Sequence, residues 1–72
     1  MTAQQQFLID TIVENMALYL MQDKNISMTD ALATIYNSTL YEKIIDTGTG
    51  LYYQSARYNY NMLSKELEYG KP

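Results

Sequence analysis

The segment FLIDTIVENMALYLM, residues 7–21, is the longest uninterrupted helical pattern in the chain and contains neither glycine nor proline. Apolar residues recur in it at helical spacing. One side of the expected helix carries Ile9, Ile12, Val13, Met16 and Leu20, with Leu8 and Tyr19 at its edges. The opposite side carries Phe7, Leu18 and Met21, near Thr11 and Glu14. A helix with one apolar side packs on one core, so we expect the second side to contact a partner.

The length of the chain and its missing residue types exclude several classes of protein. Its 72 residues allow one domain, and domains of this size are marginally stable unless disulfides, a metal ion or a second subunit support them. Cysteine and histidine are both absent, which removes disulfides, thiolate chemistry, the commonest metal ligand and the commonest general base. We therefore expect no metal and no cofactor, and we expect oligomerisation to stabilise the fold.

The charge distribution argues against nucleic acid and membrane partners. The net charge is -3, and the five Lys and Arg residues are scattered along the chain. Nucleic-acid binding relies on clustered basic side chains that meet phosphates. The longest apolar run, residues 16–21, is far shorter than the roughly 20 residues that span a bilayer. Glutamines at positions 4–6 stand where a signal peptide would be basic, so we expect a cytoplasmic protein.

The remaining pattern predicts an all-α fold of three main helices and one short one. The expected helices are residues 3–22, 28–37, 40–46 and 55–69. Two of them carry a core-facing stripe: Met28, Ala31, Leu32, Ile35 and Tyr36 in the second helix, and Ala56, Tyr60, Leu63 and Leu67 in the last.

Capping residues support these boundaries. The expected caps are Thr2, Ser27 and Ser55 at N-termini, Thr39 with Glu42 as a capping box for the short helix, and Gly70 at the last C-terminus, before a frayed Lys71-Pro72. Residues 47–50 are expected to be a loop in which Gly48 or Gly50 takes a positive φ. Residues 51–53 are expected to be an extended segment packed on the bundle.

Several short motifs suggest chemistry that their context does not support. Residues 44–48 match the Asp-Thr-Gly signature of aspartic proteases, which works only in a β-rich fold. Residues 48–50 lack the further residues of a phosphate-binding loop. Residues 39–46, taken as a DNA-recognition helix, offer one lysine against two acids. Asp10 and Glu14 share one side of the first helix, where we expect them to rim an interface. We therefore expect no catalytic residues and no enzymatic activity.

A block in the second half of the chain carries a resemblance. It comprises residues 35–41, Asp46, Thr49-Gly50-Leu51-Tyr52, Gln54-Ser55 and Tyr58. Here the chain resembles a group of small bacterial proteins of unknown function, mostly from Firmicutes, and the likeness extends from Ile12 onward. The resemblance implies a compact helical domain and brings no catalytic residue with it. Some proteins of this kind are suspected to lie beside toxin-like genes.

Three hypotheses about function follow. The first is a non-enzymatic interaction protein, expected to be a homodimer, with an interface of Phe7, Thr11, Glu14, Leu18, Met21, Tyr58, Met62 and Tyr69. The alternative is an antitoxin-like or regulatory partner of a different protein. The third is a small-molecule site in the tyrosine-rich loop 51–60, at Tyr52, Tyr53 and Tyr58. The eight tyrosines of the chain suit half-buried positions and interfaces under any of these hypotheses.

Overall fold

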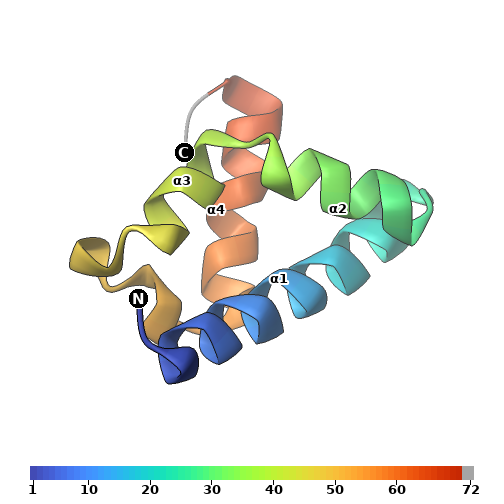
Figure 1. Cartoon of the computed structure of the whole chain (residues 1–72). Helices are drawn as coiled ribbons and strands as arrows, with labels where there is room; N and C mark the ends of the chain where they lie inside the picture. The colour runs from blue at the N-terminus through green and yellow to red at the C-terminus, as the bar shows by residue number, and fades with distance from the viewer. Residues whose placement is uncertain (71–72) are drawn as a thin grey trace.

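A computed structural model shows the chain as an all-α fold (Figure 1). It describes residues 1–70, so the predicted frayed end at Lys71 and Pro72 lies outside the described residues. The α-helices are α1 (Ala3–Lys24), α2 (Met28–Tyr36), α3 (Thr39–Ile45) and α4 (Ala56–Tyr69), and two 3₁₀ turns, η1 (Thr47–Thr49) and η2 (Leu51–Tyr53), join α3 to α4. The prediction of an all-α fold is confirmed, and the observed helix ends lie within two residues of the expected ones.

Most of the helix ends are closed by the expected residues. Thr2 and Gln5 form a capping box at the start of α1, because the Thr2 hydroxyl accepts a hydrogen bond from the Gln5 N–H and the Gln5 side chain accepts one from the Thr2 N–H. Ser27 and Ser55 are the N-caps of α2 and α4. The hydroxyl of each accepts one hydrogen bond from a backbone N–H in the first turn of its helix. Gly70 ends α4 with a left-handed φ of 82°.

The prediction for the start of α3 is wrong by one residue. Ser38, not Thr39, is the N-cap, and its hydroxyl accepts a hydrogen bond from the Tyr41 N–H at 3.1 Å. The third position of the helix is therefore Tyr41, so Glu42 cannot complete a capping box. The backbone N–H groups at this end are bonded instead by Glu66, from the distant helix α4.

The segment expected to be extended is also different in the structure. Residues 51–53 form the 3₁₀ turn η2, which follows directly on Gly50 with its φ of 72°. This left-handed conformation is accessible to glycine without strain, and it reverses the chain between η1 and η2. As a result Tyr52 enters the core, with 5% of its surface exposed, while Tyr53 next to it points to solvent.

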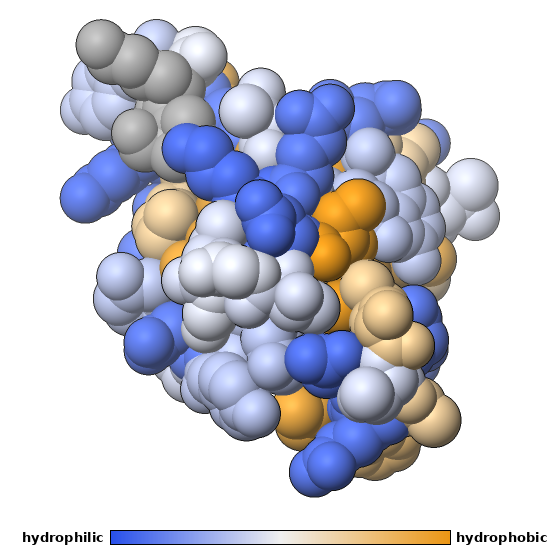
Figure 2. All heavy atoms as spheres, turned by 60° about the vertical axis from the view of Figure 1, so that its left-hand side comes forward, coloured by the Kyte–Doolittle hydropathy of each residue, from blue (hydrophilic) through white to orange (hydrophobic). Residues whose placement is uncertain are grey.

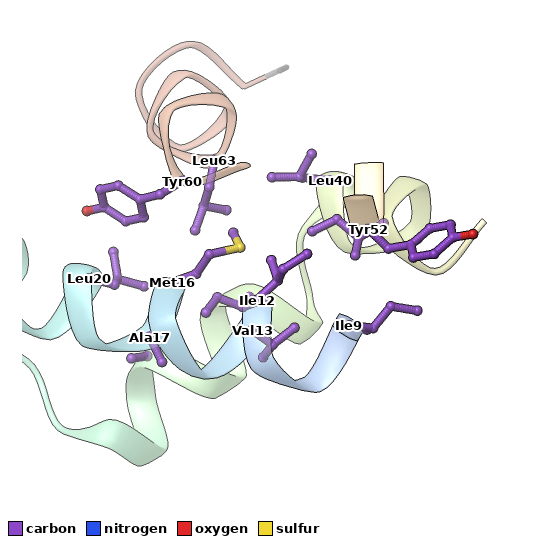
Figure 3. Packing of buried hydrophobic residues seen from close by; sticks show 13 residues of the cluster. Ile9, Ile12, Val13, Met16, Ala17, Leu20, Leu40, Tyr52, Tyr60 and Leu63 are labelled. Carbon is purple, nitrogen blue, oxygen red and sulfur yellow. The ribbon is translucent and has the colours of Figure 1, made fainter. Parts of the chain in front are cut away.

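Helix α1 is the base on which the other elements are assembled (Figure 1). α2 returns alongside it, α4 crosses it, and η2 contacts its N-terminal part. It supplies six of the thirteen buried apolar residues. Met16 lies fully buried near the middle of this cluster, and Tyr52 and Tyr60 lie at its two ends with their hydroxyls pointing outward (Figure 3). The same side of α1 that the sequence assigns to the core is therefore the buried side.

The end residues of the predicted core stripes lie outside the core. Tyr36 is 51% exposed, Leu67 43% and Met28 37%. Tyr36 is the last residue of α2 and packs edge-on against Tyr41, with ring centroids 5.0 Å apart, where solvent still reaches it. Helical spacing places a residue on a side of its helix, but burial also requires that a neighbouring element extend far enough to cover it.

The accessible surface shows that one copy of the chain is compact. It is 4583 Å², close to the roughly 4600 Å² expected of a folded monomer of this mass. Thirteen apolar residues are buried within the one chain. Within residues 1–70, no helix combines the length and the hydropathy needed to cross a bilayer.

Candidate interaction surface on the first helix

One side of α1, most of which faces away from the core, carries a regular row of residues. We call this row the outer stripe, and it consists of Phe7, Thr11, Glu14, Leu18 and Met21. Successive members are separated by four, three, four and three residues. This spacing keeps all five on one side of a helix and is the spacing of the contact seam in two-stranded coiled coils.

Most of the outer stripe is open to solvent. Phe7 is 68% exposed and Leu18 50%, and both Thr11 and Glu14 are also exposed. Met21 differs from the others because it is half-buried and packs against the core cluster. Of the three apolar residues that the sequence places on this side of α1, Phe7 and Leu18 are therefore exposed, and Met21 is only partly exposed.

The charges along the outer stripe all have the same sign. Between residues 3 and 23, α1 contains no Lys or Arg, and its first cation is Lys24. Asp10 and Glu14 are both exposed and lie one turn apart. Gln6 donates a hydrogen bond to the Asp10 carboxylate at 2.8 Å, which orients that side chain without neutralising it. The stripe is thus apolar at both ends and acidic in its middle.

Tyr36 of α2 and Tyr41 of α3 form an aromatic pair. Burial is the largest cause that raises the pKa of the Tyr41 hydroxyl, followed by the neighbouring Tyr36 and by the negative charge of Asp10. Tyr36 and Tyr41 pack edge-on against each other, with ring centroids 5.0 Å apart.

The three α4 residues in the predicted interface form a separate area. Tyr58 is 49% exposed and Tyr69 69%, whereas Met62 is half-buried and packs against the core cluster. Tyr58 and Tyr69 are about 16 Å apart along the helix, because each residue adds 1.5 Å. Within the part of the chain that the structure describes, no hydrogen bond or aromatic pair joins them to the outer stripe.

The tyrosine-rich loop does not bring its three tyrosines together around one site. Tyr52 is buried, and its hydroxyl accepts a hydrogen bond from the Gln5 side chain at 3.0 Å. Tyr53 is 74% exposed and Tyr58 lies on the next helix, 49% exposed. Tyr52 thus fastens η2 to the start of α1, which is a structural role. This arrangement gives no support to the small-molecule hypothesis.

A groove between the ends of α1 and α4 was not predicted from the sequence. It has a volume of about 490 Å³ and is lined by Asp23, Lys24, Tyr60, Ser64, Leu67 and Glu68. The Tyr60 hydroxyl donates a hydrogen bond to the Asp23 carboxylate at 2.5 Å. The pKa of Tyr60 is raised, first by burial and then by this bond. The groove joins residues 37 positions apart in the sequence, so spacing alone could not reveal it.

Side-chain contacts in and beside this groove hold the two helices together. The rings of Tyr19 and Tyr60 lie 5.4 Å apart between α1 and α4. The Arg57 guanidinium lies 4.1 Å from the centre of the Tyr19 ring, within the range of a cation–π interaction. Together with the bond between Tyr60 and Asp23, these contacts fasten α4 across the C-terminal half of α1.

Comparisons with known proteins add no further residues to the site. Searches of protein-family models, curated proteins and solved structures give no match to this chain. The resemblance to small Firmicutes proteins therefore stays a prediction from the sequence. Within residues 1–70, no group of three or more His, Cys, Asp or Glu residues is placed to hold a metal ion.

Proposed function

We propose that this chain is a small, non-enzymatic interaction protein of the bacterial cytoplasm that associates with a second copy of itself through the outer stripe of α1. The observation that carries the proposal is the exposure of Phe7 and Leu18 on the helix whose other side builds the core. Exposed apolar residues are common when they are scattered singly. Here they lie on one straight, 22-residue helix at the spacing of a helix–helix seam.

The apolar area sets how strong such an association can be. The exposed parts of Phe7 and Leu18 amount to roughly 200 Å² per copy. Burying that area on both copies contributes about 10 kcal/mol at ~25 cal/mol per Å². Association itself costs about 4–15 kcal/mol in lost freedom of motion. The two quantities are of similar size, so we expect a weak, reversible dimer rather than a permanent one.

The rest of the visible surface fits a limited interface. Figure 2 shows the side of the molecule on which α3, η1 and η2 lie, and the strongly apolar residues there form separate patches between polar ones. The predicted α4 residues Tyr58, Met62 and Tyr69 are a smaller second contact area in this proposal, and Tyr69→Glu tests them.

A different protein is the second candidate for the partner, and the charge of α1 favours it. Asp10 and Glu14 lie in or beside the outer stripe, and no Lys or Arg precedes Lys24 in α1. A partner helix with apolar residues flanked by Lys or Arg would complement both features. This candidate corresponds to the antitoxin-like or regulatory partner expected from the sequence.

Sedimentation equilibrium tests the homodimer. The wild-type chain is measured from roughly 10 µM to 1 mM, the range expected for a weak dimer, together with Leu18→Glu and the control Tyr53→Glu. Tyr53 is 74% exposed and lies on η2, outside the outer stripe. We expect twice the chain mass for the wild type and the control at high concentration, and the monomer mass for Leu18→Glu. A wild-type monomer at every concentration, or a Leu18→Glu dimer, contradicts the proposal.

Co-purification from the native host tests the second candidate. A tagged wild-type chain and the tagged Leu18→Glu variant are compared at equal expression. A partner that binds the wild type and is lost in the variant supports a hetero-complex at the outer stripe. A partner retained equally by both excludes this stripe as its binding site.

A further inference from the structure

The segment between α2 and α4 is a unit with its own internal hydrogen bonds. We call this segment the strap, and it consists of residues 39–53, which form α3, η1 and η2. We infer that the strap opens and closes as one unit while α1, α2 and α4 stay packed together, and that the carboxylate of Glu66 is the latch that holds it closed. This inference goes beyond the proposed self-association and does not depend on it.

Hydrogen bonds within the strap connect its three elements. The Thr49 hydroxyl in η1 donates a hydrogen bond that is shared by the carbonyl oxygens of Lys43, at 2.6 Å, and Asp46, at 2.9 Å. The Asp46 carboxylate accepts a bond from the Gly48 N–H at 3.0 Å. The N–H of Leu51, at the start of η2, donates to the Thr49 hydroxyl oxygen at 3.3 Å. We therefore expect α3, η1 and η2 to move together.

Few hydrogen bonds join the strap to the helices around it. Within residues 1–70 they come from three side chains, which are Glu66, Gln5 and Asn59. Glu66 accepts bonds of 2.7 and 2.8 Å from two backbone N–H groups of α3. Gln5 donates one bond of 3.0 Å to the Tyr52 hydroxyl, and Asn59 donates one of 3.1 Å to the Leu51 carbonyl oxygen. Hydrogen bonds to a charged group are the stronger kind, so Glu66 contributes most to the closed state.

The strap contributes little to the buried core. Nine of its fifteen residues are exposed, and its buried residues are Leu40, Ile44 and Tyr52. The helices α1, α2 and α4 supply the other ten of the thirteen buried apolar residues. Leu40 and Tyr52 lie toward one end of the core and Leu20 lies at the other (Figure 3). Opening of the strap therefore uncovers one end of the core and leaves the other end packed.

The two ends of the strap are held by helices that stay closed. Ser38 directly precedes the strap, and its buried hydroxyl donates a hydrogen bond of 2.6 Å to the Ile35 carbonyl oxygen of α2. Ser55 follows shortly after the strap and caps α4 by accepting a hydrogen bond from the Tyr58 N–H at 3.0 Å. The strap can consequently leave the core without unwinding α2 or α4.

Asn59 carries a buried group that favours the open state. Its Oδ1 has no hydrogen-bond partner in the described part of the chain, although its Nδ2 bonds to the Leu51 carbonyl oxygen. A buried acceptor without a partner destabilises the closed state, because it has lost its hydrogen bond to water. When the strap opens, water reaches Asn59 and this cost is removed. Glu66 therefore holds the strap closed against an opposing contribution from Asn59.

Native-state hydrogen exchange, followed by NMR at low protein concentration, tests the inference on the wild-type chain. The amides of Leu40, Thr49 and Tyr53 are hydrogen-bonded and represent α3, η1 and η2. We expect these three to share one opening equilibrium and to be protected roughly a hundredfold less than the amides of Met16 and Leu20 in α1. Equal protection of all five amides would mean that the chain opens only as a whole, and unequal protection within the strap would mean that it is not one unit. Either result overturns the inference.

Two variants of similar cost separate the strap from the rest of the fold. The bonds of Glu66 are lost both in the open strap and in the unfolded chain, so Glu66→Gln should speed exchange about tenfold in the strap and in α1. Leu20 is fully buried at the far end of the core, and its contacts persist when the strap opens. Leu20→Val should therefore speed exchange about tenfold in α1 and leave the strap unchanged. Strap exchange that ignores Glu66→Gln, or that responds to Leu20→Val, contradicts the inference.

Thiol labelling gives an independent measure, since the chain has no cysteine of its own. Ile44→Cys places a thiol on the buried side of the strap, and Ala17→Cys places one on the buried side of α1. The urea dependence of each labelling rate reports how much surface the opening exposes. We expect a shallow dependence for Ile44→Cys and a steep one for Ala17→Cys, with far-UV circular dichroism to confirm that both are folded. Equal slopes would show that the strap opens only by complete unfolding, and the inference would be wrong.

Discussion

The Glu66 carboxylate on α4 accepts a hydrogen bond from the backbone N–H of Leu40 on α3, with 2.8 Å between Oε1 and N. Its other oxygen accepts one from the N–H of Thr39 at 2.7 Å. A seven-residue helix has little stability of its own, and its first N–H groups have no partner within the helix. Glu66 therefore ties α3 to α4 by a carboxylate placed at the positive end of the α3 dipole.

We predict that Glu66→Gln destabilises the fold by about 1–2 kcal/mol. The amide retains one oxygen acceptor but loses the negative charge and the second acceptor. Urea unfolding, followed by circular dichroism, measures the loss. Glu68→Gln serves as the control because Glu68 is exposed, two residues further along the same helix. Equal losses in the two variants would show that the bonds to α3 contribute nothing.

Asn59 gives a second prediction, because it is a fully buried polar side chain. Its Nδ2 donates hydrogen bonds to the carbonyl oxygens of Leu51 and Ser55, both at 3.1 Å, while its Oδ1 has no hydrogen-bond partner among residues 1–70. Asn59→Ala should cost about 2 kcal/mol, since the two donors are lost. Asn59→Asp should cost more, since it also buries a carboxylate. In the exposed control Asn61→Asp the melting temperature should change little. A comparable fall in this control would show that the losses at Asn59 do not come from its burial and hydrogen bonds.

The pKa of Tyr60 predicts how stability changes at alkaline pH. A raised pKa in the folded state means that the unfolded chain loses this proton first, above the ordinary value of about 10. The contribution of Tyr60 to stability is therefore complete below that pH and is lost as the pH rises through the folded pKa. Tyr60→Phe has no hydroxyl to ionise and should lack this pH-dependent contribution to stability. Its melting temperature should therefore fall less steeply than that of the wild type between about pH 9 and 11. Tyr69→Phe is the exposed control and should follow the wild type.

The two sides of α1 should respond differently to the same kind of truncation. Met16 is fully buried, so Met16→Ala should destabilise the fold by about 2–5 kcal/mol. Leu18 is half exposed, so Leu18→Ala should change the stability of the monomer by less than about 1 kcal/mol. Leu18→Ala should instead weaken self-association. Chemical unfolding of both variants at low protein concentration measures the first difference, and a large loss for Leu18→Ala would show that it belongs to the core.

Local patterns in the sequence were sufficient for the helices and most of their ends. Thr2, Ser27 and Ser55 each accept a hydrogen bond from the N–H of the residue three positions later. Such local caps can be predicted from the order of residues alone. The cap supplied by Glu66 crosses 26 positions and could not be read in this way. The turn η2 was missed for a related reason, since its three residues carry no periodic pattern and its geometry depends on Gly50.

The candidate surface was predictable only in part. Periodicity separated the two sides of α1, and the exposure of Phe7 and Leu18 agrees with it. Periodicity could not tell that Met21 is partly covered, because that depends on how the neighbouring elements pack. The groove at Tyr60 and Asp23 depends on how α1 and α4 cross, and local sequence patterns do not predict that crossing.

The left-handed residue Asn25, with a φ of 54°, ends α1 and begins the return of the chain along α2. Asparagine tolerates this conformation better than most residues other than glycine. The length of α1 is thus fixed locally, by a residue outside both its buried side and its outer stripe. Substitutions in the outer stripe consequently change the exposed side of α1 without altering the residue at which the helix ends.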